Sequence, residues 1–111
     1  MPGVQLSIIK KGDGKNFPQS GNLVSVHYIG YVDKDGSEIE WDSTRKRNRP
    51  FTFKMGVGEV IPGWEEAVAQ MSIGQRAKVT MPPELAYGEK GFGLIKPNTS
   101  ISFDVELVSV E

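Results

Sequence analysis

Apolar and polar residues alternate along most of this chain, which is the pattern of a β-strand with one face on a core. The residues that share one parity within each run are Val24, Val26 and Tyr28; Phe51, Phe53 and Met55; Ala77, Val79 and Met81; and Ile101, Phe103, Val105 and Leu107. Together with residues 4–9 and 38–42, these runs predict roughly half a dozen antiparallel strands. Asp35-Gly36 is the predicted tight turn between two of them.

One segment breaks the alternation with apolar residues three and four positions apart, as on one face of a helix. These residues are Ile61, Trp64, Ala67, Val68 and Met71. Pro62 suits the first helical position, and Gly74 lies past the end. Glu65 and Glu66 fall in the first turn, where the helix dipole favours negative charge. An antiparallel sheet carrying one short amphipathic helix on a single face is an α+β architecture.

Length and charge narrow the class of protein. The chain has 111 residues, so we expect residues 1–111 to form a single domain. A net charge of -1 and a pI near 5.9 argue against nucleic acid and membrane partners. The chain contains no cysteine, no secretory leader pattern and no apolar run long enough to span a membrane. We therefore expect a cytoplasmic protein without a metal or a cofactor.

Few residues offer nucleophilic or metal chemistry. His27 is the single histidine and lies in a strand pattern, so we expect a structural residue held by hydrogen bonds. The glycine-rich segments 56–58 and 88–93 lack the order of a phosphate-binding loop and are expected to form turns. The basic run 45–49 follows acidic residues, which favours a solvated loop over a nucleic-acid patch. Aromatic residues remain, and the pattern alone assigns them to the core.

Five segments of the chain carry more information through their order than any one does alone. They are Val26-His27-Tyr28-Ile29-Gly30; Trp41-Asp42-Ser43 leading to Arg47-Asn48-Arg49-Pro50-Phe51; Gly58-Glu59-Val60-Ile61-Pro62-Gly63-Trp64-Glu65-Glu66; Ala86-Tyr87-Gly88; and Phe103-Asp104-Val105-Glu106-Leu107. In this order they resemble the FKBP-type peptidyl-prolyl isomerases, the macrolide-binding immunophilins, over nearly the whole chain. The resemblance implies a twisted antiparallel sheet wrapped around one short amphipathic helix, and cofactor-free isomerisation of X–Pro bonds.

The resemblance also assigns roles around an apolar pocket between sheet and helix. Trp64 would be its floor, the Ile61 N–H and the Tyr87 hydroxyl would donate to a carbonyl, and Asp42, held by Arg47, would face the polar side. The other implied ligand-binding residues are the walls Tyr28, Trp41, Phe51 and Phe103, the rim residue Val60, the main-chain carbonyl of Glu59, and an overhanging flexible loop with Phe92, Leu94 and Ile95.

Such chemistry needs no nucleophile. Amide resonance gives the X–Pro bond a rotation barrier of ~18–20 kcal/mol. The twisted amide loses this resonance and is less dipolar than either planar isomer. An apolar, water-poor pocket therefore favours the twisted state, and hydrogen bonds to the carbonyl orient the substrate.

Several positions depart from the family pattern. Trp41 stands where the family usually has Phe, and Phe92 stands where it often has His. Loop 93–97 is shorter than usual, and the hairpin at 33–38 is longer. We expect Trp41 and Phe92 to alter the preference for the residue before proline without abolishing turnover.

The implied partners are X–Pro substrates and tacrolimus- or rapamycin-type macrolides, with calcineurin or the TOR kinase only in the drug-bound complex. A rival hypothesis is a non-catalytic module that uses the same pocket to hold a proline-containing segment or an apolar ligand on a partner. Single-stranded nucleic acid on the aromatic strands is a third hypothesis, which the pI disfavours.

Overall fold

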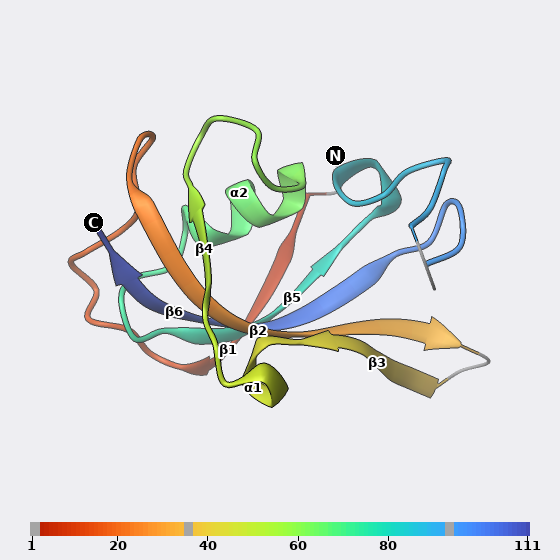
Figure 1. The fold of residues 1–111 in the computed structure, drawn as a ribbon, viewed down its shortest axis with the longest axis horizontal. Coiled ribbons are helices and arrows are strands. Elements are labelled where there is room, and N and C mark those ends of the chain that lie inside the picture. The colour runs from red at the N-terminus through yellow and green to blue at the C-terminus, as the bar shows by residue number, and fades with distance from the viewer. Residues whose placement is uncertain (1–2, 35–36, 93–94) are drawn as a thin grey trace.

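An antiparallel sheet of six strands curls around one main helix in this chain (Figure 1). The computed structural model describes residues 3–34, 37–92 and 95–111. The strands are β1 (Gln5–Lys10), β2 (Leu23–Lys34), β3 (Ser37–Ser43), β4 (Phe51–Lys54), β5 (Arg76–Met81) and β6 (Ile101–Val110). The helical elements are α1 (Thr44–Arg47), α2 (Pro62–Val68) and the 3-10 turn η1 (Pro83–Leu85). The predicted α+β class is confirmed.

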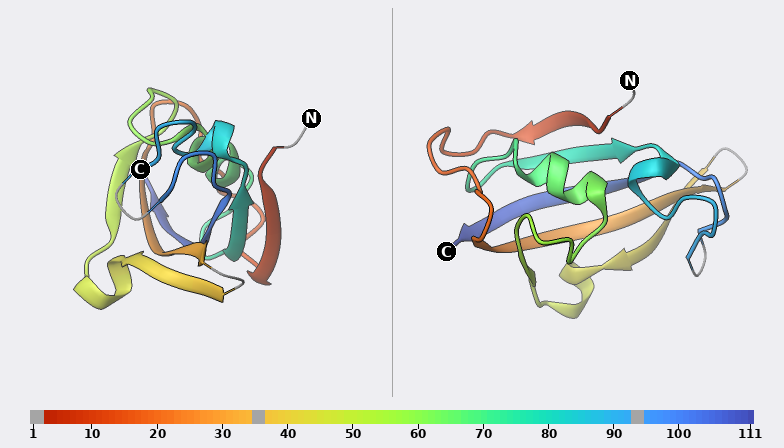
Figure 2. Two further views of the ribbon diagram at one scale, coloured as in Figure 1. Left: turned by 90° about the vertical axis from the view of Figure 1, so that its right-hand side faces the viewer. Right: turned by 90° about the horizontal axis from the view of Figure 1, so that it is seen from above.

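Strand β2 organises the sheet. The order is β1-β5-β6-β2-β3, and β4 pairs with β2 as well. β3 pairs with the second half of β2, from Ile29 onward, whereas β4 pairs with the first half, up to Val26. Two strands therefore share one edge of β2, and α1 carries the chain from one to the other, as the views in Figure 2 show.

The core lies between the sheet and α2, which crosses one face of the sheet (Figure 2). Its strand residues have the predicted parity and include Val24, Val26, Tyr28, Val32, Phe53, Ala77, Val79, Met81, Ile101, Phe103, Val105 and Leu107, and buried Met55 directly follows β4. α2 adds Trp64, Ala67 and Val68. Burying each large side chain contributes about 1.5–3 kcal/mol, so this layer is the main source of stability.

Helix α2 is shorter than the apolar spacing predicts, because the predicted stretch reaches Met71 but the helix ends at Val68. The N–H groups of Gln70 and Met71 donate to carbonyls three residues back, which makes a tighter turn. Gly74, at φ +89, then leads the chain toward β5. Met71 is nevertheless fully buried, so the pattern identified the core position correctly and the helix end incorrectly.

The basic run 45–49 is partly helical, where a solvated loop was predicted. Ser43 caps α1 by accepting a hydrogen bond from the Lys46 N–H, and Asn48 ends the helix in the left-handed region at φ 52. Three of its cations are paired with acids, as Arg45–Glu106 at 2.6 Å, Lys46–Glu40 at 2.5 Å and Arg47–Asp42 at 2.5 Å.

The other local predictions have mixed outcomes. His27 is held by a hydrogen bond to Thr44, as predicted, and segment 56–58 forms a turn. The predicted turn at Asp35-Gly36 lies outside the described residues. Within the described part of the chain, no helix is long and apolar enough to cross a membrane.

Candidate active site

A cavity of about 320 Å³ opens between the sheet and the start of α2. We call it the aromatic cavity. Its lining residues are Tyr28, Trp41, Asp42, Phe51, Glu59, Val60, Ile61, Trp64, Tyr87, Phe92 and Phe103. The fold thus brings together eleven residues that the resemblance assigned to ligand binding. They come from β2, β3, β4, β6, α2, the segment before α2 and the segment between η1 and β6.

The indole of Trp64 lies at the centre of a cluster of edge-to-face rings. Its centroid is 4.8 Å from that of Tyr28 and 5.2 Å from that of Phe103, with interplanar angles of 82° and 88°. Such pairs each contribute about 0.5–1.5 kcal/mol beyond area burial. Trp64 is 5% exposed, so the rings around it fix its orientation and leave only a small surface toward the cavity.

Trp41 forms a wall that depends on a glycine. A Cβ at Gly30 would lie 2.8–3.1 Å from atoms of the indole, so the large ring fits because Gly30 has no side chain. The ring faces Tyr87 and Phe103 edge-on, with centroid distances of 6.2 and 5.9 Å. The sheet therefore accommodates the broad Trp41 ring as a wall of the aromatic cavity.

One carboxylate gives the cavity a polar side. Asp42 Oδ2 accepts a short hydrogen bond from the Tyr28 hydroxyl, and Oδ1 accepts from Arg47 Nη1 at 2.5 Å and from the Ser43 N–H at 2.9 Å. Burial alone would raise the pKa of Asp42, but the hydrogen bonds from Tyr28 and Arg47 and the arginine charge outweigh it and lower that pKa. Burial and the bond to Asp42 raise the pKa of Tyr28 to about 12. At neutral pH, Asp42 is therefore charged and Tyr28 is protonated.

Two groups at the cavity can donate hydrogen bonds to a bound carbonyl. Burial, with the charge of Asp42, raises the pKa of Tyr87, so its hydroxyl keeps its proton at neutral pH. Ile61 precedes the first turn of α2, and its N–H donates to no described backbone carbonyl. Among the described residues, no group of three or more acidic or histidine side chains is placed to hold a metal ion.

Two of the expected ligand-binding residues do not line the aromatic cavity, and a third lies outside the described residues. Arg47 contacts Asp42 but does not line the aromatic cavity. Ile95 was expected in a loop overhanging the cavity, and this is wrong: it is 2% exposed and packs in the core. Reciprocal backbone hydrogen bonds with Phe92, of 2.8 and 2.9 Å, turn the chain so that Ile95 points inward. Leu94 lies outside the described residues.

Thr44 is a supporting residue that the sequence analysis missed. Its buried Oγ1 accepts a hydrogen bond from the Tyr28 N–H at 2.7 Å and lies 2.9 Å from His27 Nδ1. It thereby satisfies a backbone group of β2 near the switch from β3 to β4. Ser43-Thr44 ahead of a short polar run is an N-cap pattern that predicts a helix start here.

The family follows from comparison with known proteins. A model described as FKBP-type peptidyl-prolyl cis-trans isomerase matches residues 14–108. The chain belongs to this family. The FKBP-type isomerase is 53% identical over 110 residues to "Peptidyl-prolyl cis-trans isomerase Fkbp12" of Drosophila melanogaster, covering 98% of this chain and 99% of the relative. It is 51% identical over 110 residues to "Peptidyl-prolyl cis-trans isomerase FKBP1A" of Xenopus laevis, with the same coverage of 98% and 99%.

A fungal relative extends the comparison. The isomerase is 46% identical over 107 residues to "FK506-binding protein 1" of Debaryomyces hansenii, covering 96% of this chain and 93% of that protein. The predicted family and enzyme class are confirmed: the protein is a peptidyl-prolyl cis-trans isomerase, which interconverts the two isomers of X–Pro peptide bonds.

Proposed function

We propose that this isomerase rotates X–Pro bonds inside the aromatic cavity, with the proline ring on Trp64. The observation that carries this proposal is a concave set of rings around a nearly buried indole, with the Asp42 carboxylate on one side. A proline ring is apolar and flat enough to pack on an indole face. The peptide on either side of it remains polar and requires hydrogen-bond partners.

Removal of water is the first contribution to catalysis. Planar amide isomers are more dipolar than the twisted transition state, so water stabilises them more strongly. A cavity walled by aromatic rings replaces that water and reduces this ground-state stabilisation. A millionfold acceleration corresponds to ~8 kcal/mol, which several modest contributions can supply without acid–base chemistry.

Orientation is the second contribution. The Tyr87 hydroxyl and the Ile61 N–H would hold substrate carbonyls, which leaves the X–Pro bond free to turn. Asp42 acts through the shape of the wall, because its hydrogen bond to the Tyr28 hydroxyl fixes that ring edge-on to Trp64. Arg47 and the Ser43 N–H also donate to Asp42, so its charge is stabilised without a substrate donor.

A matched pair of tyrosine variants tests this assignment. Tyr87→Phe removes one hydroxyl from the cavity, and the loss of one hydrogen bond predicts a fall in kcat/KM of about two- to tenfold. Tyr31→Phe makes the same change beside Lys78, outside the cavity, and should leave kcat/KM unchanged. Both are measured by a protease-coupled assay with one X–Pro peptide. Equal kcat/KM values for the two variants would exclude Tyr87 as a substrate contact.

The same cavity is our proposed receptor for tacrolimus- and rapamycin-type macrolides. The name of the Debaryomyces hansenii relative as an FK506-binding protein supports this, since FK506 is tacrolimus. Calcineurin or the TOR kinase would then bind only the drug-bound complex. Trp41 and Phe92 flank the cavity, and their effect on the preference for the residue before proline stays a prediction.

A binding role without a need for catalysis is the second candidate, and it uses the same residues. Asp42→Val separates the two, because it disturbs the Tyr28 wall while leaving the floor of the cavity. If turnover were lost and the biological role in the cell kept, the protein would act as a binding module. The cytoplasmic location also stays a prediction, which imaging of the tagged full chain tests.

A further inference from the structure

A second hollow, of about 370 Å³, lies beside the aromatic cavity. We call it the arginine hollow, and its lining residues are Thr44, Arg47, Arg49, Pro50, Phe51 and Thr52. Phe51 lines both spaces and is 39% exposed, so its ring stands on the rim that separates them. A peptide that leaves the aromatic cavity past Phe51 therefore reaches the arginine hollow.

The arginine hollow carries positive charge without a carboxylate of its own. Two of its six lining residues are arginines and none is acidic. Arg47 binds Asp42 through Nη1, and its side chain is 52% exposed, so other guanidinium N–H groups remain available. Within the described part of the chain, Arg45, Lys46 and Arg47 each have an acidic partner within 4.0 Å, whereas Arg49 has none.

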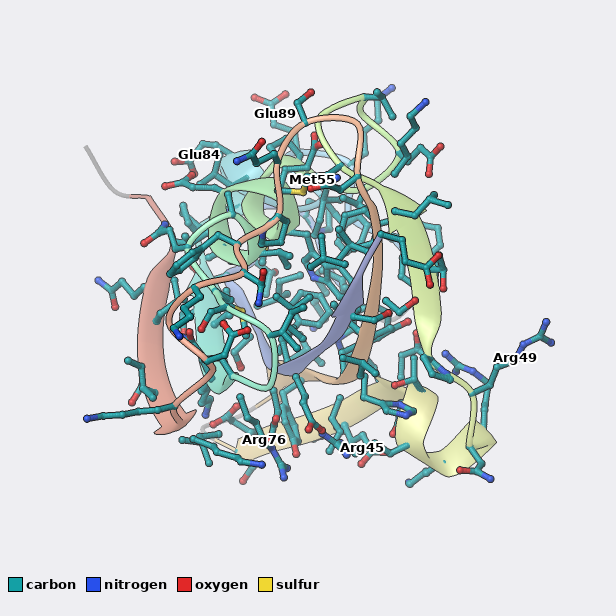
Figure 3. All side chains as sticks on the ribbon, turned by 90° about the vertical axis from the view of Figure 1, so that its left-hand side faces the viewer. Arg45, Arg49, Met55, Arg76, Glu84 and Glu89 are labelled. Carbon is teal, nitrogen blue, oxygen red and sulfur yellow. The ribbon has the colours of Figure 1, made fainter. Side chains whose placement is uncertain are left out.

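The backbone that presents Arg49 is fixed although the side chain is free. Its N–H donates to the Thr44 carbonyl at 3.1 Å, after the left-handed turn at Asn48, and Pro50 restricts the backbone of Arg49, which precedes it. Figure 3 shows the Arg49 side chain extending from the segment between α1 and β4 into solvent. A guanidinium that is free and solvent-exposed on a fixed backbone is suited to a carboxylate, which it can bind with two parallel hydrogen bonds.

We propose that Arg49, with the free N–H groups of Arg47, forms a subsite for an acidic side chain of the substrate. The inference rests on the proposed function, because it requires the substrate proline to lie in the aromatic cavity. Phe51 lines both spaces, so the acid lies on the side of the proline that passes Phe51. The subsite selects substrates and takes no part in rotation of the bond.

Paired peptides test the subsite in the full-length protein. Three peptides share one X–Pro bond: one carries Gln on both sides of it, and the other two carry Glu on the N-terminal or the C-terminal side. The readout is the ratio of kcat/KM for each Glu peptide to that for the Gln peptide, which cancels any general change in activity. Exposed ion pairs are weak, so we expect a ratio of about three for one Glu peptide.

Two variants locate the effect. Arg49→Gln should bring that ratio close to one, and about 0.5 M salt should do the same for the unmodified protein. Lys10→Gln removes an exposed charge on β1, at the opposite edge of the sheet, and should keep the ratio. A ratio near one for both Glu peptides, or a ratio unchanged in Arg49→Gln, would overturn the subsite.

A macrolide control separates this failure from failure of the proposed function. If a saturating macrolide stops turnover of the Gln peptide while the Glu ratio is one, the subsite is wrong and the aromatic cavity stands. If the macrolide binds and turnover of all three peptides continues, the assignment of catalysis to the aromatic cavity is wrong. The subsite proposal is then wrong as well, because it requires the substrate proline to lie in that cavity.

Discussion

Asp42 is the residue on which the polar wall of the aromatic cavity depends. Its carboxylate accepts hydrogen bonds from a tyrosine, an arginine and a backbone amide. Such a carboxylate is stabilised in its charged form, which is why its pKa falls although burial acts in the opposite direction. Protonation of Asp42 at acid pH would weaken its hydrogen bond with the Tyr28 hydroxyl. The orientation of the Tyr28 ring in the cavity wall therefore depends on pH.

The stability of the protein should follow this titration. A carboxylate whose pKa is lower in the folded state adds stability above its unfolded pKa, about 3.9, and loses it as the pH falls through the lower folded value. Asp42→Asn should therefore lower the urea midpoint at pH 6, and the difference from the unmodified protein should shrink below about pH 4. Glu89→Gln changes an exposed acid and is the control. Its urea midpoint should equal that of the unmodified protein at both pH values. If the urea midpoint of Asp42→Asn differed from that of the unmodified protein by the same amount at pH 3 as at pH 6, the charge of Asp42 would not be the source of this stability.

Individual side chains of the site were predictable to different degrees. Tyr28 and Phe103 share parity with core residues, and the order of the motifs distinguished them from ordinary core aromatics. Ile95 was misplaced because its burial depends on a backbone bridge to Phe92, a contact that residue types alone do not specify. Trp41 was expected as a wall, but its dependence on Gly30 became clear only from their distance in the fold.

At the scale of elements, the junction of β3, α1 and β4 determines where the cavity opens. β3 and β4 share one edge of β2, so the ladder of backbone hydrogen bonds is interrupted between them. Thr44 bridges this interruption by accepting the Tyr28 N–H, and the same residue starts α1. The short helix therefore joins two strands and also supports the strand that supplies the cavity wall.

Removing the Thr44 hydroxyl should loosen β2 locally. Thr44→Val keeps the volume but leaves the buried Tyr28 N–H without its acceptor, which costs about 1–3 kcal/mol. We expect a lower unfolding free energy and faster hydrogen exchange of the Tyr28 amide. Thr44→Ser keeps the oxygen and should retain protection of that amide. Equal exchange rates in the two variants would show that Thr44 contributes only packing.

The elements differ in how much of them the sequence determines locally. Strands such as β5 and β6 bury one face against the core, so their alternation predicts them directly. Edge strand β1 was also predicted, although its residues Ile8 and Ile9 are 60% and 56% exposed. Residues in an edge strand keep their intrinsic preference for the β conformation even where their side chains are not buried. α1 was missed because it consists of few residues, and one of its ion pairs joins Arg45 to Glu106, 61 positions away.

Across the whole molecule, one layer of side chains serves both as core and as the lining of the aromatic cavity. Trp64 and Phe103 pack in the core and also line the aromatic cavity. The sheet curls around α2 (Figure 2). The aromatic cavity opens where Ile61 and Trp64, at the start of α2, meet residues of the sheet. Family membership was predictable because the motifs occur in order along the chain. The expectation of one domain over residues 1–111 stays a prediction.

The most direct test of the account is a tacrolimus titration in which turnover and binding are followed on the same sample. Binding is followed by tryptophan fluorescence, because both tryptophans line the cavity. Catalysis of an X–Pro peptide is followed by the protease-coupled assay. The account predicts that turnover falls in proportion to occupancy and reaches the uncatalysed rate at one drug molecule per chain. Fluorescence that reports a saturated cavity while catalysis continues would contradict the claim that the X–Pro bond rotates there.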